Sequence, residues 1–239
     1  MGELKGRKIV VMGGTSGIGL AAARQLATRG AAVIVTGRNS ERAELVRKDN
    51  PALTVEIVDA SSPDAVRGFY RTLASMDDLV LCVSGSKGAG PFPRADLAEL
   101  RGGFEEKFFA HFSAAQAALP ILNRSGSLTF ISAISARAAN PGTAGLAAIN
   151  GAIEAMVKPL ARELRPLRVN AISPGVVETP WWDRLIPEVR QTLLKQAAAS
   201  SLVGRNGSAQ EIASAVEFVV SNGFVTGTVL EIDGGLRLS

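Results

Sequence analysis

Residues 8–19 read Lys-Ile-Val-Val-Met-Gly-Gly-Thr-Ser-Gly-Ile-Gly. A run of β-branched and other apolar residues passes directly into a glycine-rich turn, after which apolar residues recur at helical spacing. Glycines in such a turn allow the backbone to bend tightly and to approach a pyrophosphate, while the N-terminus of the next helix offers unpaired N–H groups. The stretch therefore predicts a nucleotide site at the turn. The alternative is a plain strand-to-helix connection.

The rest of the chain repeats this alternation of short apolar runs and amphipathic stretches. Near-continuous apolar strands separated by helices indicate a parallel sheet covered on both faces. We predict an α/β fold, a Rossmann-like, doubly wound parallel β-sheet of about seven strands flanked by helices, in a single domain over residues 1–239. The predicted strands are 8–12, 32–36, 53–58, 79–83, 127–132, 167–172 and 228–232, and the predicted helices are 17–29, 40–48, 63–74, 104–122, 143–164 and 208–221.

Two segments interrupt the alternation, and both follow predicted strands. Residues 84–96 are rich in Gly and Pro, and residues 175–201 contain Trp181 and Trp182. In an open α/β sheet, the loops that leave the carboxyl ends of strands form the ligand crevice. We therefore predict a substrate loop near residues 176–201, whose paired indoles suit an aromatic or extended apolar small-molecule substrate. Alternatively, one indole packs into the core and the other at a contact between subunits.

The 239 residues include one Cys, one His and one Tyr. A disulfide framework needs paired cysteines, and a structural zinc site needs about four Cys or His ligands, so we expect neither a disulfide nor a metal site. A Ser-His-Asp or Cys-His mechanism would have to use His111, the only histidine.

Charge and hydropathy patterning disfavour two classes of partner. The formal net charge of +4 is spread along the chain without a block of Lys and Arg, so we expect no nucleic-acid partner. No apolar run approaches the ~18 residues of a spanning helix, and the first residues lack the apolar region of a signal peptide. Gly6 stands where N-myristoylation of Gly2 requires Ser or Thr. We expect a soluble, cytoplasmic protein with no membrane partner.

The end of the second predicted strand reads Thr36-Gly37-Arg38-Asn39. An NAD site usually places Asp or Glu here for the ribose 2′-hydroxyl, whereas an Arg accommodates a 2′-phosphate. Gly37 removes the competing carboxylate and Arg38 supplies a positive charge. We therefore predict NADP(H) in preference to NAD(H); the alternative is that Arg38 is a solvated residue at the start of a helix.

Further motifs follow along the chain. Gly-x-x-x-Gly-x-Gly stands at Gly13, Gly17 and Gly19, and residues 82–85 read Cys-Val-Ser-Gly. Residues 170–180 read Asn-Ala-Ile-Ser-Pro-Gly-Val-Val-Glu-Thr-Pro, and residues 233–235 read Asp-Gly-Gly. In this order the motifs resemble the short-chain dehydrogenase/reductase family over essentially the whole chain. The cofactor-binding residues that the Gly-rich turn, the second strand and the resemblance together imply are Gly13, Thr15, Ser16, Gly17, Ile18, Gly19, Arg38, Asn39, Asp59, Ala60, Ser84, Gly85, Asn150, Pro174, Gly175, Val177 and Thr179.

The catalytic residues depart from the family pattern. Ordinary members use a Tyr as general acid, a Lys four residues later, a Ser thirteen residues before the Tyr and an Asn on the preceding helix. Aligning the flanking motifs places Lys107 at the Asn, Ala133 at the Ser, Leu146 at the Tyr and Asn150 at the Lys. Because Tyr70 is the only tyrosine and is followed four residues later by Ala, the chain contains no Tyr-x-x-x-Lys motif.

Lys107 is the leading candidate to replace the missing donors. An ammonium at this position could stabilise a developing alkoxide or donate a proton, especially if burial lowers its pKa. His111 follows at i+4 on the same helix face, and Ser135 lies on the same side of its strand as Ala133. We therefore predict Lys107, Ser135 and His111 as catalytic residues. The alternatives are a surface lysine, a histidine at a subunit interface and an ordinary strand-end serine.

Three functions remain open at this point. The first is an NADP(H)-binding oxidoreductase with a non-standard active site, which reduces a carbonyl or activated C=C of a small organic substrate. The second is a non-redox lyase, cyclase or isomerase that uses Lys107 and His111 as acid and base. The third is a catalytically silent nucleotide-binding protein. Because similar proteins are usually dimers or tetramers, we also expect a homodimer or homotetramer.

Overall fold

The computed structural model describes residues 4–239. Residues 1–3 lie outside the described part of the chain, and with them Gly2, on which the expectation about N-myristoylation depends. Within residues 4–239, no helix combines the length and apolar character that crossing a membrane requires.

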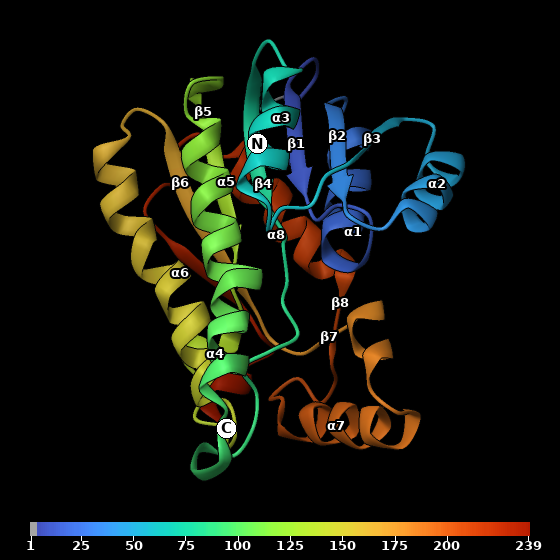
Figure 1. Cartoon of the computed structure of the whole chain (residues 1–239), viewed down its shortest axis with the longest axis vertical. Helices are drawn as coiled ribbons and strands as arrows, with labels where there is room; N and C mark the ends of the chain where they lie inside the picture. Colours follow the sequence, from blue (N-terminus) through green and yellow to red (C-terminus); the bar gives the residue numbers. More distant parts are fainter. Residues whose placement is uncertain (1–3) are drawn as a thin grey trace.

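Seven parallel strands form one sheet in the order β3-β2-β1-β4-β5-β6-β9 (Figure 1). From β1 the chain runs outward to β3, then returns to place β4 beside β1 and runs outward in the other direction. The strand order therefore reverses between β1 and β4, which confirms the predicted doubly wound sheet. The strands are β1 (Lys8–Met12), β2 (Ala32–Gly37), β3 (Leu53–Ile57), β4 (Met76–Leu81), β5 (Leu122–Ile131), β6 (Arg168–Pro174) and β9 (Val229–Ile232).

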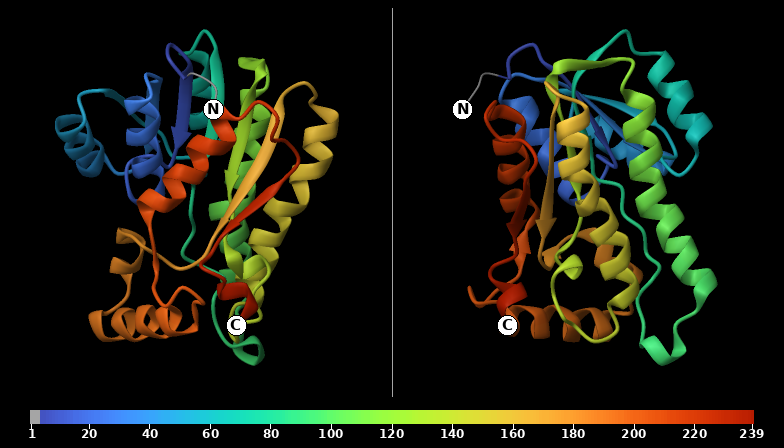
Figure 2. Two further views of the ribbon diagram at one scale, coloured as in Figure 1. Left: turned by 180° about the vertical axis from the view of Figure 1, so that it is seen from behind. Right: turned by 90° about the vertical axis from the view of Figure 1, so that its left-hand side faces the viewer.

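Helices cover both faces of this sheet (Figure 2). Strand side chains alternate between the two faces, so Val11 packs with Leu26 of α1 in one apolar cluster, while Val10 packs with Ile153 of α6 in the other. Helices α1, α2 and α8 contribute to the first cluster, and α3, α5 and α6 contribute to the second. Their bounds are α1 (Gly17–Thr28), α2 (Ser40–Asp49), α3 (Pro63–Arg71), α5 (Ala110–Ala118), α6 (Ala144–Glu163) and α8 (Ala209–Ser221).

Several predicted elements differ from those observed, among them the strand predicted at 127–132, which is observed as Leu122–Ile131. The predicted helix 104–122 is not one α-helix: η2 (Phe104–Phe109) is a π-helix that continues into α5, and Leu122 already belongs to β5. β5 begins this early because Leu122 pairs with Met76, ahead of a register shift in the β4–β5 ladder. The predicted strand 79–83 ends at Leu81, which leaves Cys82 and Val83 in the following loop.

The two irregular segments lie together at the end of the molecule where the strands terminate (Figure 2). The segment after β4 leads into η1 (Phe92–Arg94) and α4 (Leu97–Gly103), and η3 (Ile134–Ala136) follows β5. After β6 come β7 (Val177–Glu178), η4 (Pro180–Arg184), α7 (Pro187–Ser200) and β8 (Gly207–Ser208). β7 and β8 pair in parallel, so the two ends of this segment lie side by side. η5 (Leu236–Leu238) lies near the end of the chain.

Candidate functional site

A cavity of ≈ 340 Å³ opens at the carboxyl ends of the strands, where the strand order reverses. Its walls come from the glycine-rich turn after β1, the ends of β4, β5 and β6, the first turns of α6 and residues of η4. Ligands of open α/β sheets bind at this point, since the loops diverge on either side of it. The volume falls in the ordinary range of small-molecule sites.

The turn after β1 requires its glycines. Gly13 has a φ of +80°, and a Cβ there would lie 2.8 Å from the backbone of Cys82. A Cβ on Gly19 would collide with the carbonyl oxygen of Gly13. Ser16, the N-cap of α1, makes no capping hydrogen bond with its side chain, so its hydroxyl and the first N–H groups of α1 face the cavity without an intrahelical partner. These features fit the phosphate cradle that the sequence predicts.

Most of the predicted cofactor-binding residues line this cavity. Those that line it are Gly13, Ser16, Gly17, Ile18, Gly19, Ser84, Gly85, Asn150, Pro174, Gly175, Val177 and Thr179. Those outside its lining are Thr15, Arg38, Asn39, Asp59 and Ala60, which lie in the turn after β1 or follow β2 and β3.

The residues after β2 have distinct roles in the structure. Arg38 is exposed, and its charge lowers the pKa of Asp59, although the hydrogen bonds that Ser61 donates lower it more. Asn39 caps α2, because its side-chain oxygen accepts from the backbone N–H of Arg42 at 2.7 Å. Gly37 has no room for a side chain, since a Cβ there would collide with the hydroxyl group of Thr15. This steric reason for a glycine is not visible in the sequence.

Lys107 lies in the π-helix η2 and lines the cavity. Its Nζ donates a hydrogen bond to the backbone oxygen of Ser132 at 3.2 Å. Burial lowers the pKa of Lys107 to about 8, and the negative charge of Glu154 opposes this shift. An amine with this pKa exchanges its proton near neutral pH, so it can act as a general acid. Lys107 is therefore not the surface lysine of the alternative interpretation.

His111 does not reach the cavity. The ring is fully buried, 6.0 Å from the ring of Phe130 between centroids. His111 lies one helical turn after Lys107, and at that position its ring packs in the core and not against the cavity. Burial, followed by the charge of Lys107, lowers its pKa to about 3, and the Val83 backbone opposes this shift only weakly. Neither ring nitrogen makes a hydrogen bond of ordinary geometry within the described residues. A neutral core imidazole supports neither the catalytic role nor the subunit contact considered for it.

The four positions that aligned with the family's catalytic residues come together in the cavity wall as Lys107, Ala133, Leu146 and Asn150. Asn150 Nδ2 donates to Ser135 Oγ at 3.1 Å and to the backbone oxygen of Leu146 at 3.0 Å. Asn150 Oδ1 is buried and has no partner within the described residues. An unpaired buried acceptor is costly, so this oxygen suits a ligand hydroxyl such as one on a ribose. Ser135 also lines the cavity, although it lies in η3 and not on the strand from which its orientation was predicted.

Two further ionisable side chains, Tyr70 and Glu154, lie outside the cavity wall. Tyr70 lies on α3, buried in the core, and burial raises its pKa, so it has no access to a substrate. No motif in the sequence points to Glu154. Its side chain is only 8% exposed and it accepts a hydrogen bond from Ser132 Oγ at 2.8 Å. The signal that could have found it is its position one helical turn after Asn150.

Trp181 and Trp182 both line the cavity, in edge-to-face contact with ring centroids 4.8 Å apart. Trp181 Nε1 donates to the backbone oxygen of Gly85 at 3.1 Å, which ties η4 to the loop after β4. Trp182 Nε1 donates to the backbone oxygen of Val177 at 2.9 Å. The guanidinium of Arg184 covers Trp181, with Cζ 3.1 Å from the ring centroid. With both N–H groups engaged, the indoles present apolar surface to the cavity.

Residues 13–237 match the model of the family described as Enoyl-(Acyl carrier protein) reductase. The chain belongs to the short-chain dehydrogenase/reductase family. Among curated relatives, a Thermotoga maritima 3-oxoacyl-(acyl-carrier-protein) reductase is 30% identical over 98% of this chain and 99% of its own length. An L-fucose dehydrogenase of Bos taurus is 29% identical over 98% of this chain and 90% of its own length.

Solved structures of short-chain dehydrogenases/reductases share this fold. A small-chain dehydrogenase in complex with NADPH is 32% identical, with a TM-score of 0.85 over 98% of this chain and 100% of that chain. A Brucella melitensis short-chain dehydrogenase/reductase, described as a glucose/ribitol dehydrogenase, is 28% identical, with a TM-score of 0.88 over 98% of each chain. The family and the fold expected from the sequence motifs are therefore confirmed.

Proposed function

We propose that this short-chain dehydrogenase/reductase is an NADP(H)-dependent oxidoreductase with a non-standard active site, which reduces a carbonyl or activated C=C and uses Lys107 as proton donor. The observation that carries the proposal is the set of ionisable side chains in the cavity wall, which in the described part of the chain are Cys82, Lys87 and Lys107. Burial raises the pKa of Cys82 to about 12, so the thiol keeps its proton. Lys87 is 40% exposed and pairs with Glu106 at 3.5 Å. Lys107 is the remaining candidate.

The cavity residues fit a dinucleotide. The glycines after β1 leave space for a pyrophosphate, and Asn150 Oδ1 offers an acceptor for a ribose hydroxyl. Arg38, exposed after β2 and outside the cavity wall, supports recognition of a 2′-phosphate by its charge. The NADPH bound to a relative of similar fold supports the same cofactor. Bound NADPH would supply the hydride for the reduction.

The chain's own part in the reaction is to place the substrate and to supply a proton. Lys107 Nζ carries the proton that the oxygen of a reduced carbonyl, or the adjacent carbon of an activated C=C, would accept. Before transfer, the ammonium would stabilise negative charge developing on the substrate. Ser135, held by Asn150 in the same wall, would donate a second hydrogen bond to that oxygen. The apolar indole surfaces of Trp181 and Trp182 support an aromatic or extended apolar substrate.

Replacement of Lys107 by Ala tests the proton donor. We expect Lys107→Ala to slow NADPH oxidation by ~10²–10⁴-fold, the usual contribution of a placed general acid, while NADPH binding measured by titration remains intact. The matched control is Lys158→Ala, which removes an exposed lysine of α6. Equal turnover by Lys107→Ala and the native chain would refute the proposed role of Lys107.

A second candidate function is a lyase, cyclase or isomerase with no net redox step. Ala133 and Leu146, which stand in the cavity wall where the family has hydroxyl donors, favour it. Turnover of a substrate in the absence of any nicotinamide nucleotide would support this function over the first.

The outer surface supports the proposal that the protein is a homo-oligomer. Phe109, Phe112 and Leu119 follow one another along η2, α5 and the turn after α5, and they are 47%, 45% and 37% exposed. Apolar side chains gathered along one surface are typical of an interface.

A further inference from the structure

Glu154 is a buried carboxylate on α6, outside the cavity wall. Both of its oxygens have partners. Oε1 accepts from Ser132 Oγ at 2.8 Å, and Oε2 pairs with Arg137 Nη2 at 2.9 Å. Arg137 in turn pairs with Glu231, and Glu231 pairs with Arg237. Ion pairs therefore link Glu154 through Arg137 to Glu231 and Arg237, and neither oxygen of Glu154 is left without a partner.

Ser132 connects Glu154 to the cavity lysine. Its backbone oxygen accepts the hydrogen bond from Lys107 Nζ at 3.2 Å, while its backbone N–H donates to the carbonyl of Ile172 at 2.9 Å. Glu154 and Lys107 therefore hold the same residue, the first through the hydroxyl and the second through the carbonyl. A displacement of Ser132 would move the acceptor that orients the lysine.

Glu154 is also the negative charge that acts on Lys107. Of the titratable groups near Lys107, His111 is neutral and the Cys82 thiol is protonated at neutral pH, and Lys87 and Glu106 pair with each other at 3.5 Å. Burial lowers the pKa of Lys107, and the charge of Glu154 raises it. The groups that surround Lys107 are Cys82 after β4, Lys87 in the loop after it, Glu106 on η2, His111 on α5 and Glu154 on α6.

We propose that Glu154 is the positioning residue for the cavity lysine: it anchors Ser132, whose carbonyl oxygen holds the Lys107 ammonium, and it adds a carboxylate to the surroundings of that ammonium. The role rests on the proposed function, in which Lys107 donates a proton. Glu154 does not line the cavity and takes part in no bond that forms or breaks. An amine in an apolar cavity has no opposite charge beside it, and the Glu154 carboxylate supplies one to Lys107.

The test is a direct titration of Lys107 in the full-length Glu154→Gln variant. In protein labelled with ¹³C-lysine, the Lys107 signal is assigned by its loss in Lys107→Arg. We expect the pKa of Lys107 to fall by about one pH unit, since an opposite charge is removed from its surroundings. The high-pH limb of NADPH oxidation should move down by the same amount, with kcat reduced at high pH and restored at lower pH, and KM little changed.

Two variants complete the test. Glu231→Gln removes the next carboxylate of the ion-pair chain, which does not contact Ser132, and should leave the pKa of Lys107 unchanged. Glu154→Asp keeps the charge but shortens the side chain, so the pKa of Lys107 should fall by less than in Glu154→Gln. If Glu154→Gln gives too little folded protein, Glu154→Asp is titrated alone.

The same pKa of Lys107 in the native chain and in the Glu154 variants would overturn the inference. Because the titration requires no turnover, it separates this result from a failure of the proposed function. If the pKa falls as expected but Lys107→Ala retains full activity, Glu154 controls the charge of a lysine that is not the proton donor.

Discussion

Gly37 shows how a single residue restricts the nucleotide site. Thr15 occupies the space that a side chain at position 37 would fill, so a carboxylate cannot be placed there without displacing Thr15. The residue that would favour a free 2′-hydroxyl is thereby excluded on steric grounds, and the adjacent Arg38 is left exposed at the surface. The proposed preference for NADP(H) therefore depends on the charge of Arg38.

Replacing Arg38 by Ala tests this dependence. We expect Arg38→Ala to weaken NADPH binding by about 10–100-fold, since a hydrogen bond to a charged group contributes ~1.5–3 kcal/mol, and to leave NADH binding unchanged. Isothermal titration of both nucleotides measures the two effects. The control is Arg42→Ala, in the same helix region and also exposed. An equal loss for NADH and NADPH would contradict a specific role in binding the 2′-phosphate.

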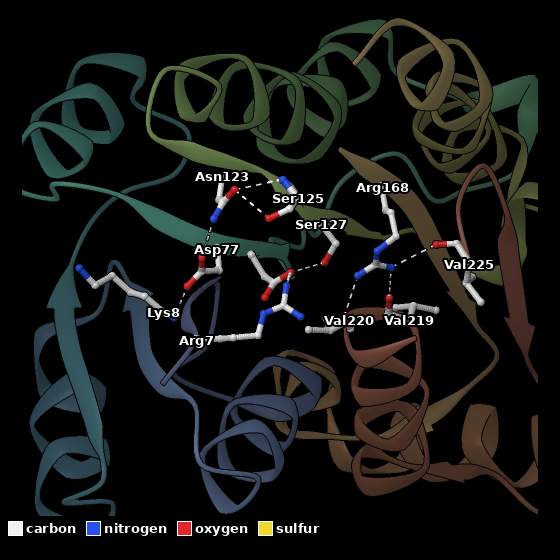
Figure 3. Close-up of polar contacts among 11 residues, drawn as sticks. Arg7, Lys8, Asp77, Asn123, Ser125, Ser127, Arg168, Val219, Val220 and Val225 are labelled. Atoms are coloured by element: carbon white, nitrogen blue, oxygen red, sulfur yellow. Dashed lines mark hydrogen bonds and ion pairs between the residues drawn. The ribbon is translucent and has the colours of Figure 1, made fainter. Parts of the chain in front are cut away.

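Asp78 is a buried carboxylate near the amino ends of the strands, away from the cavity. Its Oδ1 accepts from Arg7 at 2.7 Å and from Ser127 at 2.6 Å, and Oδ2 has no partner within the described residues. Figure 3 shows Arg7 and Ser127 converging from neighbouring strands, with Arg168 beyond them. Burial raises the pKa of Asp78 to about 6, although the Ser127 hydrogen bond and the charges of Arg7 and Arg168 oppose the shift.

The raised pKa predicts a pH dependence of stability. Between the unfolded pKa of ~3.9 and the folded value, the folded state binds more protons, so the contribution of Asp78 to the free energy of unfolding falls as pH rises. We therefore expect the stability of Asp78→Asn relative to the native chain to increase by about 1–3 kcal/mol from pH 4 to pH 6 and to stay level above. Urea denaturation at several pH values measures this difference. Asp64→Asn, at a 93% exposed side chain, should show no such trend.

At the scale of the elements, α8 is fixed at both ends. Ser208 and Glu211 form a capping box at its N-terminus. At its C-terminus, the buried Arg168 of β6 donates to the carbonyl oxygens of Val219 at 2.6 Å and Val220 at 2.7 Å, and to that of Val225 at 3.1 Å (Figure 3). The carbonyls of Val219 and Val220 would otherwise be unsatisfied at a buried helix end, whereas that of Val225 also accepts from Asn170 Nδ2 at 2.9 Å. Arg168 thus joins the last turn of α8 to the sheet.

Removing this guanidinium should destabilise the whole fold. We expect Arg168→Met to lower the free energy of unfolding by about 2–4 kcal/mol, because the buried carbonyls of Val219 and Val220 lose their donor at once. Chemical denaturation followed by far-UV circular dichroism measures the loss. Arg162→Met, at an exposed position of α6, should change stability by less than about 0.5 kcal/mol. Similar stabilities for the two variants would show that water satisfies the α8 carbonyls.

The elements that the sequence predicted well are those with strong local signals. β1 was predicted with its observed bounds, because a β-branched run there is bounded by a glycine turn. The π-helix η2 was not predicted, since apolar spacing does not distinguish a π-turn from an α-turn. The position of His111 was wrong for a related reason: spacing places it on the face of Lys107, but not at the same depth in the molecule.

At the scale of the whole molecule, the reversal of strand order assembles the cavity from segments far apart in the chain. The order of motifs predicted this assembly, and most of the predicted cofactor residues lie in its wall. Contacts between distant side chains could not be predicted. The hydrogen bond from Trp181 to Gly85 and that from Ser132 to Glu154 depend on how loops and helices pack, for which a single sequence carries no local signal.

The placement of the tryptophans has an optical consequence. The chain contains two, Trp181 and Trp182, and both stand in the cavity wall, so all of its indole emission originates there. A reduced nicotinamide absorbs at the wavelengths where indole emits, and a nucleotide in the cavity would therefore quench both rings by energy transfer. The guanidinium of Arg184 over Trp181 makes the emission maximum sensitive to any change in the contact between these two residues. The cavity thus carries its own fluorescent reporter, with no label and no indole elsewhere in the chain.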